Sequence, residues 1–375
     1  MFKNYRIRDY GFKLLIYCII LGFCGVIMVG SAKESLQNKQ GIGFLIGVFV
    51  MIIVSLIDYN LIAKFYWVIY VLNIGLLSLT LTPLGHAVSG SARWIEIFGF
   101  RFQPSDTAKI LLILFFAQFI MVNKNKVKNF KFVLMSVVLL SVPWFLIYKQ
   151  PDLSTSIAVF VVVCIILFVG GIDYRVVIGV IAVAVPVFII AFNLVLQPNQ
   201  SIIEDYQQRR ILAFVDPENY PDDALQQMNS VTAIASGQLD GKGYKNNEIS
   251  SLKNGNFIIE PQTDFIFAVL GEEFGFKGGV FVIVFLYLTS FECIKIARRA
   301  KDTCGSMIAT GVGSLIAVQS FFNIGVNTFL LPNTGIPLPF VSYGLTSLLS
   351  MYIGIGLVLN VKLQCIRGKV NNNIM

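Results

Sequence analysis

Long apolar stretches alternate with short polar connections along almost the whole chain. A helix needs about 20 residues to cross a bilayer, and apolar runs near that length recur along the sequence. They occupy residues 12–30, 42–57, 65–82, 107–122, 132–148, 153–172, 176–196, 265–293, 307–330 and 342–361. The pattern predicts an all-α polytopic membrane protein with ten transmembrane helices, forming a single domain over residues 1–375.

Composition excludes an ordinary soluble protein. Hydrophobic residues make up 56% of the chain, the mean hydropathy is +0.74 and only 13% of residues are charged, whereas a soluble domain has roughly 25% charged residues. Basic residues flank the first apolar stretch, as in a signal peptide. Nine further stretches favour an uncleaved membrane anchor instead.

The basic residues predict how the helices are oriented. If ten spans alternate in direction, the clusters in four connections and termini all fall on one side: Lys3, Arg6, Arg8 and Lys13; Lys124, Lys126, Lys128 and Lys131; Lys295, Arg298, Arg299 and Lys301; Lys362, Arg367 and Lys369. Short cytoplasmic loops are the ones enriched in Lys and Arg. Both termini are therefore expected in the cytoplasm, and the net charge of +8 needs no nucleic-acid partner.

The opposite side receives the irregular sequence. A large polar connection between the seventh and eighth spans, residues 193–264, is too long for a passive loop and is expected to contain helices that cover something. Residues 83–109 place basic side chains around a QPSD turn, in which Ser105 or Asp106 can cap the next helix. Residues 332–344, PNTGIPLPFVSYG, hold three prolines and two glycines, which exclude a regular helix.

Irregular backbone at membrane depth predicts a cavity in the outer half of the bundle, because such backbone must be buried in protein or line water. Gln319, Asn323 and Asn327 recur every four residues and share one helix face. For these three, hydrogen bonds between helices are favoured over substrate contact. The six cysteines form no CxxC pair and indicate neither a zinc site nor a disulfide framework.

Seven motifs carry a resemblance to a known family. They are GSARWI (90–95), QPSDTAK (103–109), QPDLST (150–155), RRILAFVDPE (209–218), SGQLDGKG (236–243), TDFIFAVLGEEFGF (263–276) and NTGIPLPFVSYG (333–344). In this order, they resemble the signatures of the SEDS family, the RodA, FtsW and SpoVE group. The chain departs from the family pattern at Ala92, Asp106 and Gln262, where Arg, Glu and His are usual.

The resemblance implies a peptidoglycan glycosyltransferase of the bacterial cytoplasmic membrane. Such an enzyme polymerises lipid II into β-1,4 glycan strands at the outer face, among membrane lipids, usually beside a class B penicillin-binding protein that cross-links them. Residues 240–276 and the short termini look more like the RodA elongation branch than the division or sporulation branches. A lipid II flippase or transporter, and a scaffold of the cell-wall complex without catalysis, remain as alternatives.

Glycan polymerisation assigns roles to particular side chains. Asp264 stands at the expected outer mouth of the eighth span, where a carboxylate can take the proton of the attacking sugar hydroxyl. The leaving diphosphate needs preplaced cations, for which Arg93, Lys109 and Arg210 are the candidates. Trp94 either holds a sugar face or anchors the membrane interface.

Four further residues complete the predicted substrate site. Asp106 and Asp152 either fix those cations or bind a divalent ion, Mg²⁺ or Mn²⁺, although no cluster of oxygen ligands is evident and no cofactor is certain. Glu260 and Ser342 lie within or beside the motifs that carry the resemblance and are assigned to substrate binding.

Overall fold

Ten apolar helices form the body of the protein. The computed structural model describes residues 9–83, 85–88, 91–97, 100–197, 200, 203–245 and 260–371. Within them the ten helices are α1 (Phe12–Ala32), α2 (Glu34–Leu56), α4 (Tyr66–Leu79), α5 (Pro104–Val122), α6 (Phe130–Lys149), α7 (Leu153–Val169), α8 (Tyr174–Val195), α11 (Ile266–Ala297), α12 (Thr303–Asn327) and α13 (Leu345–Asn371). They coincide with the ten apolar stretches of the sequence, and the polytopic all-α class is confirmed.

Length and composition distinguish nine of these ten helices. In the described residues, seven are long and apolar enough to cross a membrane, whereas α4 and α7 are shorter apolar helices. The main difference from the predicted spans is α2, which begins at Glu34 and not at residue 42. The first turns of α2 are polar, so they lie outside the apolar run although they are helical. Hydropathy alone therefore places the start of the helix too late.

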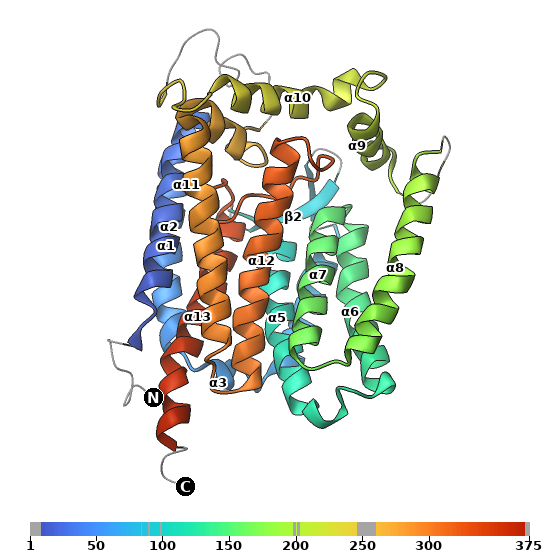
Figure 1. The fold of residues 1–375 in the computed structure, drawn as a ribbon, viewed down its shortest axis with the longest axis vertical. Coiled ribbons are helices and arrows are strands. Elements are labelled where there is room, and N and C mark those ends of the chain that lie inside the picture. The colour runs from blue at the N-terminus through green and yellow to red at the C-terminus, as the bar shows by residue number, and fades with distance from the viewer. Residues whose placement is uncertain are drawn as a thin grey trace.

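The helices run side by side, and the two ends of the bundle differ (Figure 1). Most side chains of α5, α12 and α13 are buried, so these three helices form the centre. Helix α1 begins and α13 ends at the same end of the bundle. The opposite end is covered by α9 (Asp205–Val215) and α10 (Pro221–Ser236), and we name it the cap end.

The long polar connection thus contains helices of its own, and α10 is fixed to the bundle by polar contacts. Gln227 of α10 donates to the carbonyl oxygens of Val326 and Leu331 at 3.0 and 2.9 Å. Ser230 donates to the carbonyl of Asn327 at 2.8 Å. These bonds join α10 to carbonyls in the last turn of α12 and in the residues that follow it.

A kink in α11 fits the segment after α10 against the bundle. Gly275 has φ +61°, and a Cβ there would lie 2.5 Å from the amide nitrogen of Gly241, so only glycine fits. Lys242 pairs with the buried Glu272 at 2.9 Å, and Ser31 of α1 donates to the neighbouring Glu273. Both carboxylates therefore join elements of the fold.

The connection before α5 differs from the irregular turn that the sequence indicates. It contains a three-stranded antiparallel sheet in the order β1 (Gly85–Val88), β2 (Ser91–Ile97) and β3 (Phe100–Phe102). The predicted cap by Ser105 or Asp106 is wrong: Gln103 is the N-cap residue, no side chain caps the helix, and Pro104 occupies the first turn. Proline is common at this position because an N–H in the first turn has no acceptor within the helix, so its absence costs no hydrogen bond.

Candidate functional site

Asp264 lies at the cap end in the turn that leads into α11. Asn323 and Asn327 of α12 each donate to its main-chain carbonyl at 2.9 Å. Its partly buried carboxylate faces Gly335 of the 332–344 loop, because a Cβ on that glycine would lie 3.3 Å from Oδ2. Gly335 has φ +72°. The glycine thus lets the loop backbone pass beside the carboxylate without covering it.

Charges from several elements act on this carboxylate. Loss of surrounding water is the largest influence and raises the pKa of Asp264 to about 6. The guanidinium of Arg210 opposes that rise, Glu260 adds to it, and Arg93 and Asp152 have smaller effects of opposite sign. The carboxylate is therefore ionised near neutral pH and is more basic than a fully hydrated aspartate.

Two arginines predicted to bind the diphosphate approach the same region from different elements. Arg93 of β2 donates through Nε to the carbonyl of Gln150 at 3.1 Å and through Nη2 to the carbonyl of Pro151. Its Nη2 lies 3.4 Å from the hydroxyl of Tyr206 on α9. The guanidinium of Arg210, one turn further along α9, lies 5.7 Å from the Tyr206 ring centroid.

Arg210 carries its charge in a poorly hydrated place. Burial lowers the pKa of its guanidinium, whereas Asp264 acts in the opposite direction. Among the ion pairs of the described residues, neither Arg210 nor Arg93 is joined to Asp264 at 4.0 Å or less. The site thus combines a basic carboxylate with two nearby cations that remain able to receive an anion.

Asp152 begins α7 and borders this region. Its Oδ1 accepts the amide of Thr155 at 3.2 Å, and Ser105 donates to its Oδ2 at 3.5 Å. The next hydroxyl, that of Ser154, donates to the carbonyl of Thr334 at 2.7 Å. Asp152 therefore caps α7 and joins it to α5, and Ser154 joins α7 to the 332–344 loop.

Lys109 does not join the two arginines. Its ammonium forms a 2.7 Å ion pair with Asp106 one turn earlier in α5, and both side chains are almost fully buried, at 2% and 6% exposure. The suggestion that Asp106 fixes one of the cations agrees with this pair. An ion pair inside a membrane helix requires both partners, because either charge alone would be poorly solvated.

We expect Lys109→Met to destabilise the protein by about 3–5 kcal/mol, because it leaves Asp106 buried and unpaired. The double variant Lys109→Met/Asp106→Leu should recover most of this loss, since it removes both charges. Thermal unfolding in detergent measures the two effects. A single variant as stable as the wild type would contradict this account. Wild-type glycan polymerisation by a stable double variant would remove Lys109 from the diphosphate site.

The remaining predicted residues are not all brought together. Trp94 follows Arg93 on β2 at a β-bulge: Trp94 pairs with His86 of β1 and Ala92 pairs with Ala87, so Arg93 is the extra residue between the two pairs. Glu260 is exposed at the edge of the turn that holds Asp264. Ser342 is buried, and its hydroxyl donates to the carbonyl of Thr263 at 2.6 Å and accepts the amide of Leu338 at 2.8 Å. Its hydrogen bonds hold the protein together, and substrate binding by these three residues stays a prediction.

Two residues of this region were missed by sequence reasoning. Tyr206 binds the Pro151 carbonyl through its hydroxyl at 2.9 Å and stacks beside Arg210. Its spacing of four residues from Arg210 on an amphipathic helix was the available signal. Gly335 lies beside Asp264 only because the 332–344 loop folds back onto α11, for which the sequence carries no local signal.

The predicted Mg²⁺ or Mn²⁺ is not tested by the structure. Within the described ranges, no three His, Cys, Asp or Glu side chains gather in a way that could hold a metal ion.

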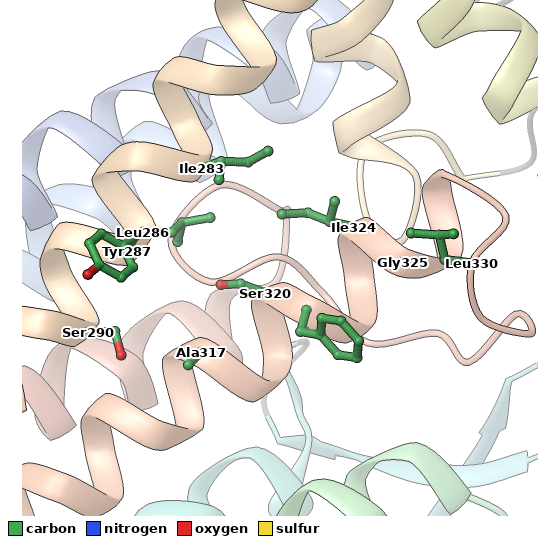
Figure 2. Close-up of a pocket in the computed structure, with 10 residues that line it drawn as sticks. Ile283, Leu286, Tyr287, Ser290, Ala317, Ser320, Ile324, Gly325 and Leu330 are labelled. Atoms are coloured by element: carbon green, nitrogen blue, oxygen red, sulfur yellow. The ribbon is translucent and has the colours of Figure 1, made fainter.

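A separate apolar groove lies between α11 and α12 (Figure 2). Its volume is about 340 Å³. It is lined by Ile283, Leu286, Tyr287, Ser290, Ala317, Ser320, Phe321, Ile324, Gly325 and Leu330. Tyr287 and Phe321 are each 63% exposed at its borders. The groove therefore opens at the apolar flank of the bundle, on the surface that a bilayer would cover.

Comparison with known proteins agrees with a multi-pass membrane protein that has its polar site at one end. The family model of cell cycle proteins of the FtsW, RodA and SpoVE group matches residues 12–365. "Probable peptidoglycan glycosyltransferase FtsW" of Geobacter sulfurreducens is 32% identical over 371 residues, covering 95% of this chain and 96% of the relative. "Peptidoglycan glycosyltransferase MrdB" of Escherichia coli is 33% identical over 351 residues, covering 93% and 91%.

Solved structures show the same fold. A structure described as "Structural coordination of polymerization and crosslinking by a peptidoglycan synthase complex" matches with a TM-score of 0.78 and 24% identity, covering 95% of this chain and 98% of that chain. The Thermus thermophilus rod shape determining protein RodA matches with a TM-score of 0.68 and 22% identity, covering 95% and 97%. With the relatives above, these matches show a polytopic membrane protein of the peptidoglycan glycosyltransferase class. It belongs to the FtsW/RodA/SpoVE family, as its motifs indicate.

Proposed function

We propose that this protein polymerises lipid II into β-1,4 glycan strands. The observation that carries the proposal is a carboxylate of raised pKa, Asp264, held at the cap end beside the cations Arg93 and Arg210. Relatives that cover almost the whole chain are named peptidoglycan glycosyltransferases, which supports this choice of reaction. A diphosphate-linked sugar suits such a site, because its lipid tail belongs beside the apolar helices and its charged head at their end.

The proposed reaction is an inverting glycosyl transfer. The hydroxyl oxygen of the acceptor sugar forms a bond to the anomeric carbon of the donor, and the bond from that carbon to the diphosphate oxygen breaks. Asp264 accepts the hydroxyl proton as the new bond forms. A general base in this position contributes typically about 10²- to 10⁴-fold to the rate.

The leaving diphosphate takes the electron pair of the broken bond, so negative charge grows on it in the transition state. Arg93 and Arg210 are placed to stabilise that charge, and their positions are set in advance by Pro151 and Tyr206. Cations that are held before the reaction need no rearrangement when the charge develops.

The direct test is polymer formation from lipid II by the purified full-length chain, with and without a class B penicillin-binding protein of the same organism. Glycan strands in either reaction would support the proposal. Movement of lipid II across vesicle membranes without polymer would favour a transporter. If an Asp264→Asn variant supports as much polymer as the wild type, the protein would be a scaffold that activates another polymerase.

We propose further that the cap end faces the outside of the bacterial cytoplasmic membrane and that both termini are cytoplasmic. The distribution of Lys and Arg supports this orientation. Helix α10 and the connection between α5 and α6, which contains the exposed Asn125, lie at opposite ends of the bundle.

In intact cells, we expect an impermeant thiol reagent to label Leu225→Cys on α10 and to leave Asn125→Cys unlabelled. Both positions are exposed, so a difference in labelling reports the side of the membrane and not burial. The host protein for both variants should lack its six native cysteines. After cell lysis both positions should react. Labelling of Asn125→Cys in intact cells would reverse the proposed orientation.

The proposed partner is a class B penicillin-binding protein that cross-links the new strands. Support comes from the likeness to a structure described as a synthase complex that coordinates polymerization and crosslinking. The groove between α11 and α12 is apolar and opens at the flank of the bundle, which suits a membrane-embedded part of such a partner.

A role in cell elongation is also proposed, on the motif likeness to the RodA branch. The comparisons do not separate it from a role in division, because relatives named FtsW and MrdB have nearly equal identity, 32% and 33%. Depletion of the protein would distinguish the two: rounded cells indicate elongation and filaments indicate division.

A further inference from the structure

Three consecutive main-chain carbonyls before α11 are held by side chains and amides from elsewhere in the fold. The carbonyl of Gln262 accepts the amide of Tyr343 at 2.8 Å. That of Thr263 accepts the hydroxyl of Ser342 at 2.6 Å. That of Asp264 accepts the side-chain amides of both Asn323 and Asn327 at 2.9 Å. Hydrogen bonds thus hold the backbone at each of these three residues. They do not involve the carboxylate of Asp264, which faces the site.

Asn323 joins the two walls of the site. Besides its bond to the Asp264 carbonyl, its Nδ2 donates to the carbonyl of Ile336 at 2.8 Å. Ile336 follows Gly335, the residue that lies beside Oδ2 of Asp264. One amide nitrogen therefore sets the distance between the carboxylate and the loop that passes in front of it.

Asn327 joins the same carbonyl to the start of α11 and to the cap. Its Oδ1 accepts the amide of Ala268 in the first turn of α11 at 3.0 Å, and the same amide also donates to the carbonyl of Phe265 at 3.0 Å. Its own carbonyl accepts the hydroxyl of Ser230 from α10 at 2.8 Å. A side chain on α12 thus caps α11, whereas the cap of a helix usually comes from the residue at its own N-terminus.

We propose that Asn323 and Asn327 are positioning residues for Asp264, which hold its carboxylate at the correct place and depth for proton transfer. The two side chains are 1% and 0% exposed, so they do not touch substrate and act through the main-chain groups they bind. This inference rests on the proposed role of Asp264 as the base. It assigns a function to two amides whose spacing alone indicated only contact between helices.

The consequence for the reaction follows from distance. A displacement of about 1 Å at a reacting group can cost about 10²-fold in rate. We expect Asn323→Ala to lower kcat by about 10- to 100-fold and to leave KM for lipid II within about threefold, because binding groups are untouched. Asn323→Ser retains one donor and should give a smaller loss of kcat.

A pH profile separates positioning from simple loss of stability. Asp264 is faced by Arg210 on α9, Arg93 on β2, Asp152 at the start of α7 and Glu260 in its own turn. A loosened carboxylate gains water, which lowers its pKa toward that of ordinary aspartate. The acid limb of kcat should therefore move to lower pH in Asn323→Ala. A change that only reduces the amount of folded protein would scale the rate at every pH and leave this limb in place.

Asn360→Ala is the matched control. Asn360 is also fully buried, and it also bonds to main chain, donating to the Ser55 carbonyl at 2.8 Å and accepting the Tyr59 amide at 3.0 Å. Its bond to Tyr59 places it beside α3 (Tyr59–Ala63), at the end of the bundle opposite the cap end. It should lose comparable stability and keep the wild-type kcat and pH profile per folded molecule.

The assay uses the full-length chain with its class B penicillin-binding partner and lipid II, and rates are divided by the amount of folded protein. A wild-type kcat or an unmoved acid limb in folded Asn323→Ala would overturn the inference. If that variant does not fold, the same criteria apply to Asn323→Ser. An active Asp264→Asn variant would instead overturn the proposed function, so the two failures are distinguishable.

Discussion

Asp264→Asn is expected to give a folded, membrane-inserted protein that makes glycan about 10²- to 10⁴-fold more slowly than the wild type. Asparagine keeps the size of the side chain and the main-chain carbonyl that Asn323 and Asn327 bind. It removes only the capacity to accept a proton. Polymerisation of lipid II by purified protein measures the loss, and thermal unfolding shows whether the fold is kept.

Asp173→Asn is the matched control for this substitution. Asp173 is a partly buried aspartate that begins α8 and accepts the amide of Arg175 at 3.0 Å. Because asparagine caps a helix as well as aspartate, this variant should retain activity. Near wild-type polymerisation by Asp264→Asn would sink the assignment of Asp264 as the base.

The wild-type enzyme should also show an acid limb near pH 6. Asp264 must be ionised to act, and its pKa is raised to about 6. Activity is therefore present above that value and is lost as pH falls through it, so kcat at pH 5 should be about tenfold below its plateau. A flat profile between pH 5 and 7 would contradict this role of the carboxylate.

Arg210→Ala should produce the second largest loss, about 10²- to 10³-fold in kcat, because it removes a preplaced cation from the leaving diphosphate. It should also move the acid limb to higher pH, since Arg210 opposes the rise in the pKa of Asp264. Arg210→Lys keeps the charge and should recover part of the activity. Polymerisation assays across pH measure both effects.

Arg209→Ala is the control, since Arg209 is the exposed neighbour on the same helix. It should change neither the rate nor the pH profile. If Arg210→Ala has the wild-type rate, Arg210 does not stabilise the leaving diphosphate. A lowered rate with an unmoved acid limb would show that Arg210 does not affect the pKa of Asp264.

Ten helices and their membrane class were predictable because hydropathy is a local property. Each apolar run must be removed from water whatever its neighbours are, and a helix satisfies its own backbone hydrogen bonds in lipid. Connections were less predictable. The sheet at residues 85–102 forms by pairing between strands of four, seven and three residues, in which an alternating pattern is too short to identify a strand, and Pro104 displaces the expected cap.

Site residues divide in the same way. Asp264, Arg93 and Arg210 were selected because charges at the ends of apolar helices are conspicuous, and the structure places them in one region. Lys109 was selected for the same reason, but it is buried with Asp106. A sequence shows that a cation exists at a helix end, whereas its partner depends on which neighbouring atoms are closest.

The sequence by itself therefore determined the helices and the family, and it singled out Asp264 as the proposed base, because hydrophobicity and motifs are read along the chain. Only the tertiary structure decided what surrounds that carboxylate. Asn323 and Asn327 reach the main-chain carbonyl of Asp264 from α12, and Gly335 lies beside its carboxylate from the loop beyond. These contacts join residues about 60 to 70 positions apart, and their hydrogen bonds exist only when packing brings the segments within a few ångströms.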